Sequence, residues 1–416
     1  MFTLNLLQPL KKLYQNFLIM GEPIIVKNRI QSIDLLRGIV MIIMALDHVR
    51  DYFHYDHFIE HDPLDFATTT PVLFLTRWFT HFCAPIFVFL SGTGIFLYGD
   101  RRNTKREVSF FLLTRGLWLM LVEILIITPL WDFRVTHVFV GLQVIWAIGL
   151  SMVVMSALIF LPYRVLLTLG LLIVFGHNLM DNFTMQGEHF SSFLWAVMHQ
   201  FHIFEINQNM KIGLIYPFLP WLGVMILGYC LGKLYLLNAN RVYRKKVLQY
   251  LGIAAVLLFV LLRWFNLYGD LHQWSSQKTS IFTILDYVNT TKYPPSLLYI
   301  LMTIVPALLI LSFLEKASGS LTQKINVFGK VPFFYYVLHL LIAHSLAWVA
   351  FFVTGHSWND LAFDFSSPDG SLPLRSGYSL GVVYGAWAVA IFILYYPCRW
   401  YSNYKATHKH WWLSYI

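Results

Sequence analysis

GIVMIIMAL, residues 38–46, carries no polar side chain, and it runs directly into LDHVRDYFHYDHFIEHD, residues 46–62. The second stretch holds four histidines and five carboxylates. Because a helix of about 20 mostly apolar residues crosses a bilayer core, we interpret residues 33–52 as a membrane helix. The acidic, histidine-rich stretch then lies at the mouth of this helix, where we expect a reaction to take place.

The whole chain is too apolar for a soluble globular protein. Of its 416 residues, 57% are hydrophobic and only 12% are charged, whereas soluble domains carry about 25% charged residues. We therefore predict an all-α polytopic membrane protein surrounded by lipid. The formal net charge of +9 would suggest a nucleic-acid partner in a soluble protein. Here the basic residues are sorted by membrane side, so we expect no nucleic-acid partner.

Apolar runs of sufficient length predict about ten transmembrane helices (10–11) in one bundle. They cover residues 33–52, 72–98, 108–129, 137–161, 163–180, 212–237, 247–268, 295–314, 327–353 and 378–402. Residues 189–206 are apolar but interrupted by His and Glu, and predict either an interfacial helix or an eleventh, re-entrant segment. We expect a cytoplasmic lead-in over residues 1–32, a transmembrane domain over 33–403 and a cytoplasmic tail over 404–416.

The charged residues favour one orientation in the membrane. With the N-terminus in the cytoplasm, most of the 30 Lys and Arg residues fall in inside segments, as the positive-inside rule requires. Most Asp and Glu residues of the loops fall outside. We therefore expect both termini to be cytoplasmic. The long outer loops, which include 51–71 and 177–211, indicate that the outside face has a function.

The first helix, SIDLLRGIVMIIMALDHV at residues 32–49, carries charges that an apolar helix normally avoids. Arg37 and His48 are eleven residues apart, which is almost three helical turns, so both face the same way and lie roughly 16 Å apart along the axis. Asp34 could pair with Arg37, and Asp51 could set the tautomer of His48. The alternative is that Arg37 is a snorkelling anchor and His48 an interfacial polar residue.

Two longer stretches resemble a known family. RIQSIDLLRGIVMIIMALDHVRDYF, residues 29–53, and LFLTRWFTHFCAPIFVFLSGTGIFLYG, residues 73–99, are similar to the bacterial branch of the heparan-alpha-glucosaminide N-acetyltransferase catalytic-domain family. GLQVIWAIGLSM at 141–152 and NVFGKVPFFYYVLHLLIAH at 326–344 extend the resemblance. The opening helix also resembles that of the wider transmembrane acyltransferases that acetylate bacterial glycans.

This resemblance implies an acetyl-CoA-dependent N- or O-acetyltransferase of the bacterial inner membrane. Such an enzyme takes acetyl-CoA from the cytoplasm and passes the acetyl group to an acceptor, often a sugar amine or hydroxyl, on the other side. The chain departs from the eukaryotic lysosomal enzyme, which carries an amide at the position of His48. It also carries His81 where the family often has an acid. The resemblance does not identify the acceptor. A homodimer is one open alternative for the oligomeric state.

Acyl transfer needs a base for the acceptor and a way to hold the thioester. We expect His48 to act as general base or as acyl carrier, oriented by Asp47 or Asp51. The residues expected to receive the CoA phosphates are Arg37 with its partner Asp34, Arg115 and Lys330. The residues expected to bind substrate are Arg77, His81, Gln143, Tyr336 and His339.

A metal is not expected, although one spacing leaves the question open. His54, His57 and His61 would share one face of a helix, which is compatible with zinc, but Pro63 follows closely. The main alternative function is a secondary transporter of a small anionic solute, since buried charges suit one. Paired Gly- or Pro-interrupted segments, which would support a transporter, are not found in matching halves of the sequence.

Overall fold

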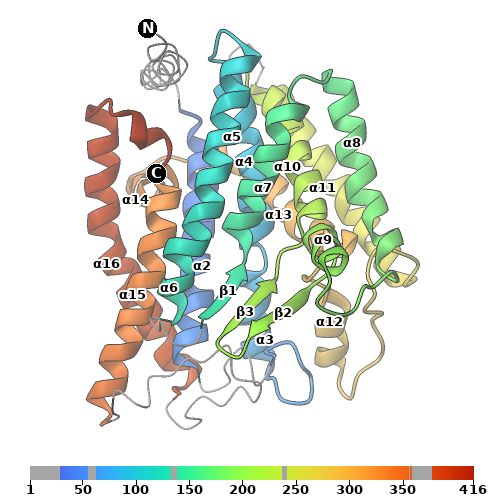
Figure 1. Ribbon diagram of the computed structural model, residues 1–416, viewed down its shortest axis with the longest axis vertical. Coiled ribbons are helices and arrows are strands. Elements are labelled where there is room, and N and C mark those ends of the chain that lie inside the picture. The colour runs from blue at the N-terminus through green and yellow to red at the C-terminus, as the bar shows by residue number, and fades with distance from the viewer. Residues whose placement is uncertain (1–28, 55–61, 133–137, 237–240, 356, 358–376) are drawn as a thin grey trace, which may run out of the picture.

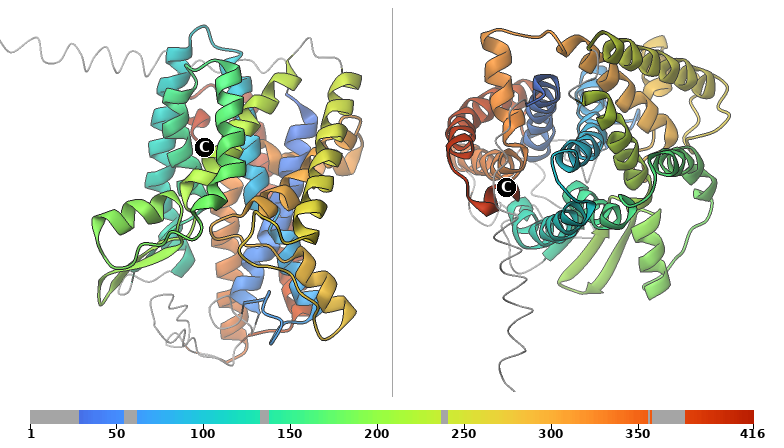
Figure 2. Two further views of the ribbon diagram at one scale, coloured as in Figure 1. Left: turned by 90° about the vertical axis from the view of Figure 1, so that its right-hand side faces the viewer. Right: turned by 90° about the horizontal axis from the view of Figure 1, so that it is seen from above.

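The computed structural model describes residues 29–54, 62–132, 138–236, 241–355, 357 and 377–416. Long helices run side by side along the longest axis of the molecule (Figure 1), and the view from above shows them gathered in one bundle (Figure 2). A small sheet lies at one end of the bundle. The expected fold class, an all-α polytopic membrane protein, is confirmed.

The bundle is built from helices that follow one another up and down. They are α2 (Gln31–Phe53), α3 (Pro71–Thr80), α4 (Cys83–Gly99), α5 (Lys105–Val122), α6 (Thr128–Asp132), α7 (Val144–Leu158), α8 (Tyr163–Gly176), α10 (Phe218–Gly232), α11 (Arg241–Trp264), α13 (Leu297–Leu314), α15 (Pro332–Val353) and α16 (Leu380–Thr407). A π-helical turn, η1 (Glu123–Ile127), joins α5 to α6. Pro85 sits in the first turn of α4, where its missing N–H is tolerated.

The two ends of the bundle differ. One end, here called the sheet end, carries η2 (His177–Met180), α9 (Phe190–Met198), α12 (Ser280–Val288) and the strands β1 (Val138–Leu142), β2 (His202–Asn207) and β3 (Met210–Leu214). The central strand β3 pairs parallel to β1 and antiparallel to β2. The opposite end, here called the α14 end, carries α14 (Ser320–Lys330), η3 (Lys233–Tyr235) and η5 (Trp411–Ser414).

The expected number of membrane spans was too high. In the described part of the chain, eight helices are long and apolar enough to cross a membrane, not ten. Segment 33–52 forms α2, which has too many charged side chains to qualify, among them Asp34, Arg37 and Asp47. In segment 137–161 the helix is shorter than expected. Residues 138–142 form the strand β1, and the helix α7 that follows has 15 residues. Both helices nevertheless pack inside the bundle (Figure 1).

The interrupted segment 189–206 is neither an interfacial helix over its whole length nor an eleventh span. Its first half forms the short helix α9, and its second half enters the sheet as β2. The strand is fixed by pairing with β3, in which Phe204 lies opposite Ile212. The prediction failed because short apolar runs suit a strand as well as a helix.

Close helix contacts in the bundle centre depend on glycine. A Cβ atom at Gly92 of α4 would overlap the carbonyl oxygen of Met225 on α10, and a Cβ atom at Gly228 of α10 would overlap the carbonyl oxygen of Phe89 on α4. Thr93 adds a hydrogen bond across the same contact, donating to the Gly228 carbonyl at 2.9 Å. Small residues at such positions let membrane helices approach closely, which is a main source of their association.

We expect Gly92→Ala to destabilise the bundle, because its methyl group meets the α10 backbone, which cannot move aside as a flexible side chain can. Overpacking of this kind costs about 1–3 kcal/mol. Gly94→Ala on the same helix is the matched control, since nothing lies within 4 Å of an added Cβ there. Thermal unfolding in detergent should show a lower midpoint for Gly92→Ala alone. Equal midpoints for the two variants would contradict this packing argument.

Candidate active site

Arg37 on α2 is held at the α14 end by two oxygens. Its Nη1 donates to Asp34 Oδ1 at 3.2 Å and to the Gly329 carbonyl at 3.3 Å. A Cβ atom at Gly329 would overlap the Asp34 carbonyl, so only glycine lets α14 approach α2 this closely. Asp34 is shared, because its Oδ2 also lies 2.9 Å from Arg29 Nε. The expected Asp34–Arg37 pair therefore exists and includes a second arginine.

Further cations lie near Arg37. Arg115 on α5 donates to the Ser414 carbonyl, and Lys405 on α16 donates to the Ile416 carbonyl at 2.5 Å. The charges of Arg115, Arg29 and Arg37 are all close enough to act on Lys405. Asp34 forms ion pairs with Arg29 and Arg37, and no ion pair with Asp34 is found for Arg115 or Lys405 among the described residues. The α14 end thus has an excess of positive charge. We call the four residues Arg29, Arg37, Arg115 and Lys405 the cation cluster.

Lys330 contributes to this region through its backbone. Its carbonyl oxygen accepts a hydrogen bond from Arg29 Nη2 at 3.2 Å. Lys330 is also the last residue of α14, and Val331 alone separates it from α15. Its ammonium group therefore belongs to the same end of the bundle as the cation cluster, while the direct contact is made by the main chain.

His48 lies further along α2, among aromatic rings. Its ring centroid is 4.9 Å from that of Trp131 and 5.1 Å from that of His339 on α15. Asp51 Oδ2 lies 3.5 Å from His48 Nδ1, which is an ion-pair distance but not a hydrogen bond. The side chain of His48 keeps 14% of its surface exposed.

His339 presents a free acceptor beside His48. Its Nδ1 lies 3.2 Å from the Tyr335 carbonyl, and because a carbonyl only accepts, Nδ1 must carry the proton of the neutral ring. Nε2 is then an acceptor, and it is buried without a hydrogen-bond partner in the described structure. The ring of Tyr336 lies 5.4 Å from that of His339. The structure thus brings His48, His339 and Tyr336 together.

Asp47 faces away from His48 and belongs to an ionic network. Its Oδ2 lies 2.5 Å from Arg77 Nη1 on α3, and its Oδ1 lies 3.0 Å from Arg50 Nη2 and accepts from Thr80 at 2.8 Å. Consecutive residues of a helix point about 100° apart, so Asp47 meets α3 while His48 meets α15. Of the two carboxylates expected to orient His48, Asp51 is the one that approaches its ring.

The same network leads back to His48. Arg50 Nη2 also contacts Asp51 Oδ1 at 2.6 Å, while the other oxygen of Asp51 faces His48. The order of contacts is Arg77, Asp47, Arg50, Asp51 and His48, with alternating charge along the arginines and carboxylates. We call this set the ionic chain. It connects α3 to the imidazole through three buried groups, Arg77, Asp47 and Arg50, and through Asp51, whose side chain is 12% exposed.

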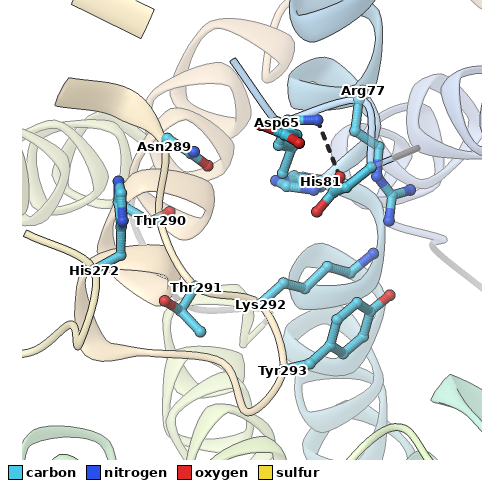
Figure 3. A pocket seen from close by; sticks show the side chains of 11 residues that line it. Asp65, Arg77, His81, His272, Asn289, Thr290, Thr291, Lys292 and Tyr293 are labelled. Carbon is cyan, nitrogen blue, oxygen red and sulfur yellow. Dashed lines mark hydrogen bonds between the residues drawn. The ribbon is translucent and has the colours of Figure 1, made fainter. Parts of the chain in front are cut away.

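A cavity of about 340 Å³ opens at the sheet end, next to the ionic chain. It is lined by Asp62, Leu64, Asp65, Arg77, His81, His272 and residues 289–293. Arg77 and His81, both expected to bind substrate, come from the end of α3 and lie across the cavity from His272 and Asn289 (Figure 3). Lys292 adds a second cation. A volume near 300 Å³ with several polar groups suits a small polar ligand.

Other expected residues lie elsewhere. Gln143 precedes α7 directly after β1, close to Glu123, whose fully buried Oε2 accepts from the Trp146 N–H at 3.2 Å. Gln143 does not line the cavity. His54 is buried directly after α2, and its backbone forms an isolated β-bridge with Tyr378. His57 and His61 lie outside the described residues, so the structure does not test a zinc site there.

Sequence reasoning missed several residues that the structure brings to the site. No site role was assigned to Arg50, Lys292 or Thr80 from the sequence. Arg50 sits three residues after Asp47, a helical pairing distance, and this was an available signal. Lys292 is remote from α3 in the chain, and no local pattern points to it.

The comparisons with known proteins identify a family for this chain. No curated protein matches the chain. The sequence does match the family described as "Heparan-alpha-glucosaminide N-acetyltransferase, catalytic" over residues 29–269. The match includes α2 and the ionic chain. It also includes the cavity-lining residues of the first part of the chain, from Asp62 to His81. Because it covers more than half of the chain, this protein belongs to the heparan-alpha-glucosaminide N-acetyltransferase catalytic family, a family of membrane acetyltransferases.

Proposed function

We propose that this protein transfers an acetyl group from acetyl-CoA to a sugar amine or hydroxyl, with His48 as general base or acyl carrier. The observation that carries the proposal is the position of His48. It is a partly exposed imidazole inside the bundle, with the Asp51 carboxylate on one side and His339 on the other. Intramembrane ionisable groups of this kind are functional candidates by default.

The cation cluster suits the donor. Arginine and lysine side chains bind phosphate through charge-assisted hydrogen bonds, and the cluster has four cations, of which Arg29 and Arg37 share the Asp34 carboxylate. Arg37 and His48 are separated by roughly 16 Å along α2, comparable in length to the pantetheine arm. Acetyl-CoA supplies an activated thioester. We assign its phosphates to Arg37 and Arg115, with Lys330 nearby, and its acetyl end to the surroundings of His48.

His48 then moves one proton in each turnover. As general base it removes the proton from the attacking amine or hydroxyl, whose nitrogen or oxygen forms a bond to the acetyl carbon. The carbon–sulfur bond breaks, and His48 returns the proton to the departing sulfur, so that CoA leaves as a thiol. As acyl carrier, a ring nitrogen forms a bond to the acetyl carbon while the carbon–sulfur bond breaks, and CoA leaves with the proton of the ring. The acceptor nitrogen or oxygen then bonds to the acetyl carbon, the carbon–imidazole bond breaks, and the acceptor's proton goes to the ring. In either case the Asp51 carboxylate stabilises the positive ring.

The cavity is the proposed binding site for the acceptor. Its lining offers hydroxyl, amide, carboxylate and cationic groups, and these match the many donors and acceptors of a sugar. Arg77 connects the cavity with His48 through the ionic chain, while His81 and Lys292 provide further contacts. Gln143, Tyr336 and His339 are proposed contacts of the acetyl group or acceptor on the path to His48.

We further propose that the α14 end faces the cytoplasm of a bacterium and that the protein lies in the inner membrane. The support is the distribution of charge. Basic residues gather in the connections and helix ends of the α14 end, as the positive-inside rule describes. Since α2 begins and α16 ends at this end of the bundle, both termini would be cytoplasmic. The acceptor then reacts from the opposite side.

We expect His48→Ala to lower kcat for acetyl transfer by at least about 100-fold, since loss of a general base costs about 10² to 10⁴ in rate. Binding of acetyl-CoA should persist, because the phosphate contacts are remote from His48. CoA release with a panel of amino sugars and neutral sugars measures the first quantity, and calorimetry measures the second. His189→Ala, an exposed histidine of the sheet end, is the control. Unchanged turnover in His48→Ala would remove His48 from the mechanism.

We expect Arg37→Gln to raise KM for acetyl-CoA about tenfold or more, because hydrogen bonds to charged groups contribute about 1.5–3 kcal/mol. Steady-state kinetics of the purified protein would show this, and kcat should change much less. Arg115→Gln should have the same kind of effect. Lys324→Gln is the control, since Lys324 is an exposed cation of α14. A KM that stays the same in both arginine variants would rule out the cation cluster as the phosphate site.

A further inference from the structure

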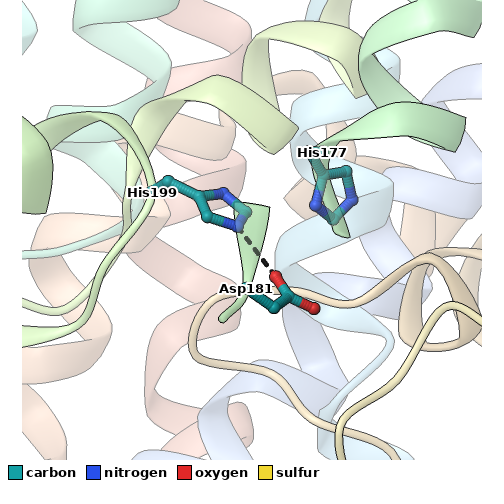
Figure 4. Close-up of side chains that lie close together, drawn as sticks. All are labelled: His177, Asp181 and His199. Carbon is teal, nitrogen blue, oxygen red and sulfur yellow. Dashed lines mark hydrogen bonds and ion pairs between the residues drawn. The ribbon is translucent and has the colours of Figure 1, made fainter. Parts of the chain in front are cut away.

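Three side chains that the acetyl-transfer site does not use converge at the sheet end. His177 and Asp181 come from the end of α8 and the η2 turn, and His199 directly follows α9 (Figure 4). One ligand atom from each lies within 4.8 Å of the others. His199 Nε2 is 2.8 Å from Asp181 Oδ1, and the rings of His177 and His199 are 5.5 Å apart.

His177 is the unusual member of this group. Its side chain is 2% exposed, and neither ring nitrogen has a hydrogen-bond partner in the described structure. A buried polar group without a partner costs about 1–3 kcal/mol. The ring lies next to the Asp181 carboxylate and the His199 ring (Figure 4). An ion between the three side chains would give a His177 nitrogen a partner.

The donor set indicates which ion fits. Two imidazole nitrogens and one carboxylate oxygen suit zinc, which takes such ligands at about 2.0–2.2 Å in a tetrahedron. Those bond lengths place ligand atoms about 3.3 Å apart, so small side-chain rotations close the group around an ion. Magnesium and calcium prefer oxygen ligands alone. The three residues leave a fourth position for water or another ligand.

The surroundings already orient the carboxylate. Asn178 Nδ2 donates to Asp181 Oδ2 at 2.7 Å, and Asn178 Oδ1 accepts from the Leu297 N–H at the start of α13, at 2.9 Å. Hydrogen bonds of this type fix metal-binding carboxylates and contribute 10- to 100-fold to affinity. The arrangement couples the three side chains to a third helix.

We propose that His177, Asp181 and His199 bind one zinc ion that fastens the end of α8 to α9. Through Asn178 the ion also supports the start of α13. None of the three residues lines the cavity or belongs to the ionic chain, so the site holds the rim of the sheet end in place and takes no part in acetyl transfer. The inference is independent of the proposed function, because it concerns different residues and a different chemistry.

The test uses the full chain, purified in detergent through a tag that contains no histidine. Mass spectrometry of the metal content should find one zinc per protein. After chelation and removal of the chelator, titration with Co²⁺ should give the visible absorption of a tetrahedral site. Asp181→Asn and His199→Gln keep the size of each side chain, so they should fold. We expect each to bind Co²⁺ more than about tenfold more weakly, since loss of an outer-shell partner alone costs that much.

His189→Ala is the matched control, because this exposed histidine lies between Asp181 and His199 in the chain. It should bind Co²⁺ as the unchanged protein does. A double variant, His57→Ala with His61→Ala, should also keep its metal. Zinc absent from the unchanged protein and no Co²⁺ spectrum would overturn the proposal. Equal Co²⁺ binding in Asp181→Asn and His199→Gln would overturn it too, and so would loss of metal in the double variant alone.

Discussion

The structure depends on pairing charges that would otherwise be very costly inside an apolar bundle. Asp47 and Arg50 on α2 and Arg77 on α3 are almost fully buried. A single unpaired charge at such depth costs at least a few kcal/mol, and removing one partner from a buried ion pair commonly costs 3–5 kcal/mol. Asp47 contacts both arginines at 3.0 Å or less. It therefore offsets much of the free-energy cost of burying these charges where α2 packs against α3. The position of α2 in turn sets the position of His48.

This pairing explains why α2 lies at the centre of the bundle although it is not apolar enough to qualify as a membrane span by composition. Its charged side chains are covered by other helices rather than by lipid. Arg37 is covered by α14, His48 by α15, and Asp47 by α3. A helix surrounded in this way can carry a row of reactive groups from one end of the bundle to the other. Helices on the outer surface, such as α11 and α16, have large exposed apolar side chains instead.

The local part of this arrangement was predictable from the sequence, and the long-range part was not. Spacings of three residues on α2 predicted the Asp34–Arg37 pair and the approach of Asp51 to His48, because helix geometry fixes such neighbours. The pairing of Asp47 with Arg77, and of Asp181 with His199, joins residues from different helices. A single sequence does not show which faces of two helices pack against each other. The sheet was missed for a related reason, since residues 138–142 become a strand only through pairing with residues 210–214.

In the proposed mechanism, the sharing of Asp51 has a consequence for His48. Asp51 Oδ1 lies 2.6 Å from Arg50 Nη2, and Asp51 Oδ2 lies 3.5 Å from His48 Nδ1, so the arginine shares the carboxylate that faces the proposed base. Arg50 also binds Asp47 from the same helix, so one guanidinium holds both carboxylates of this part of α2. Arg50, to which the sequence analysis assigned no role, therefore positions the carboxylate beside the proposed base without contacting the His48 ring itself.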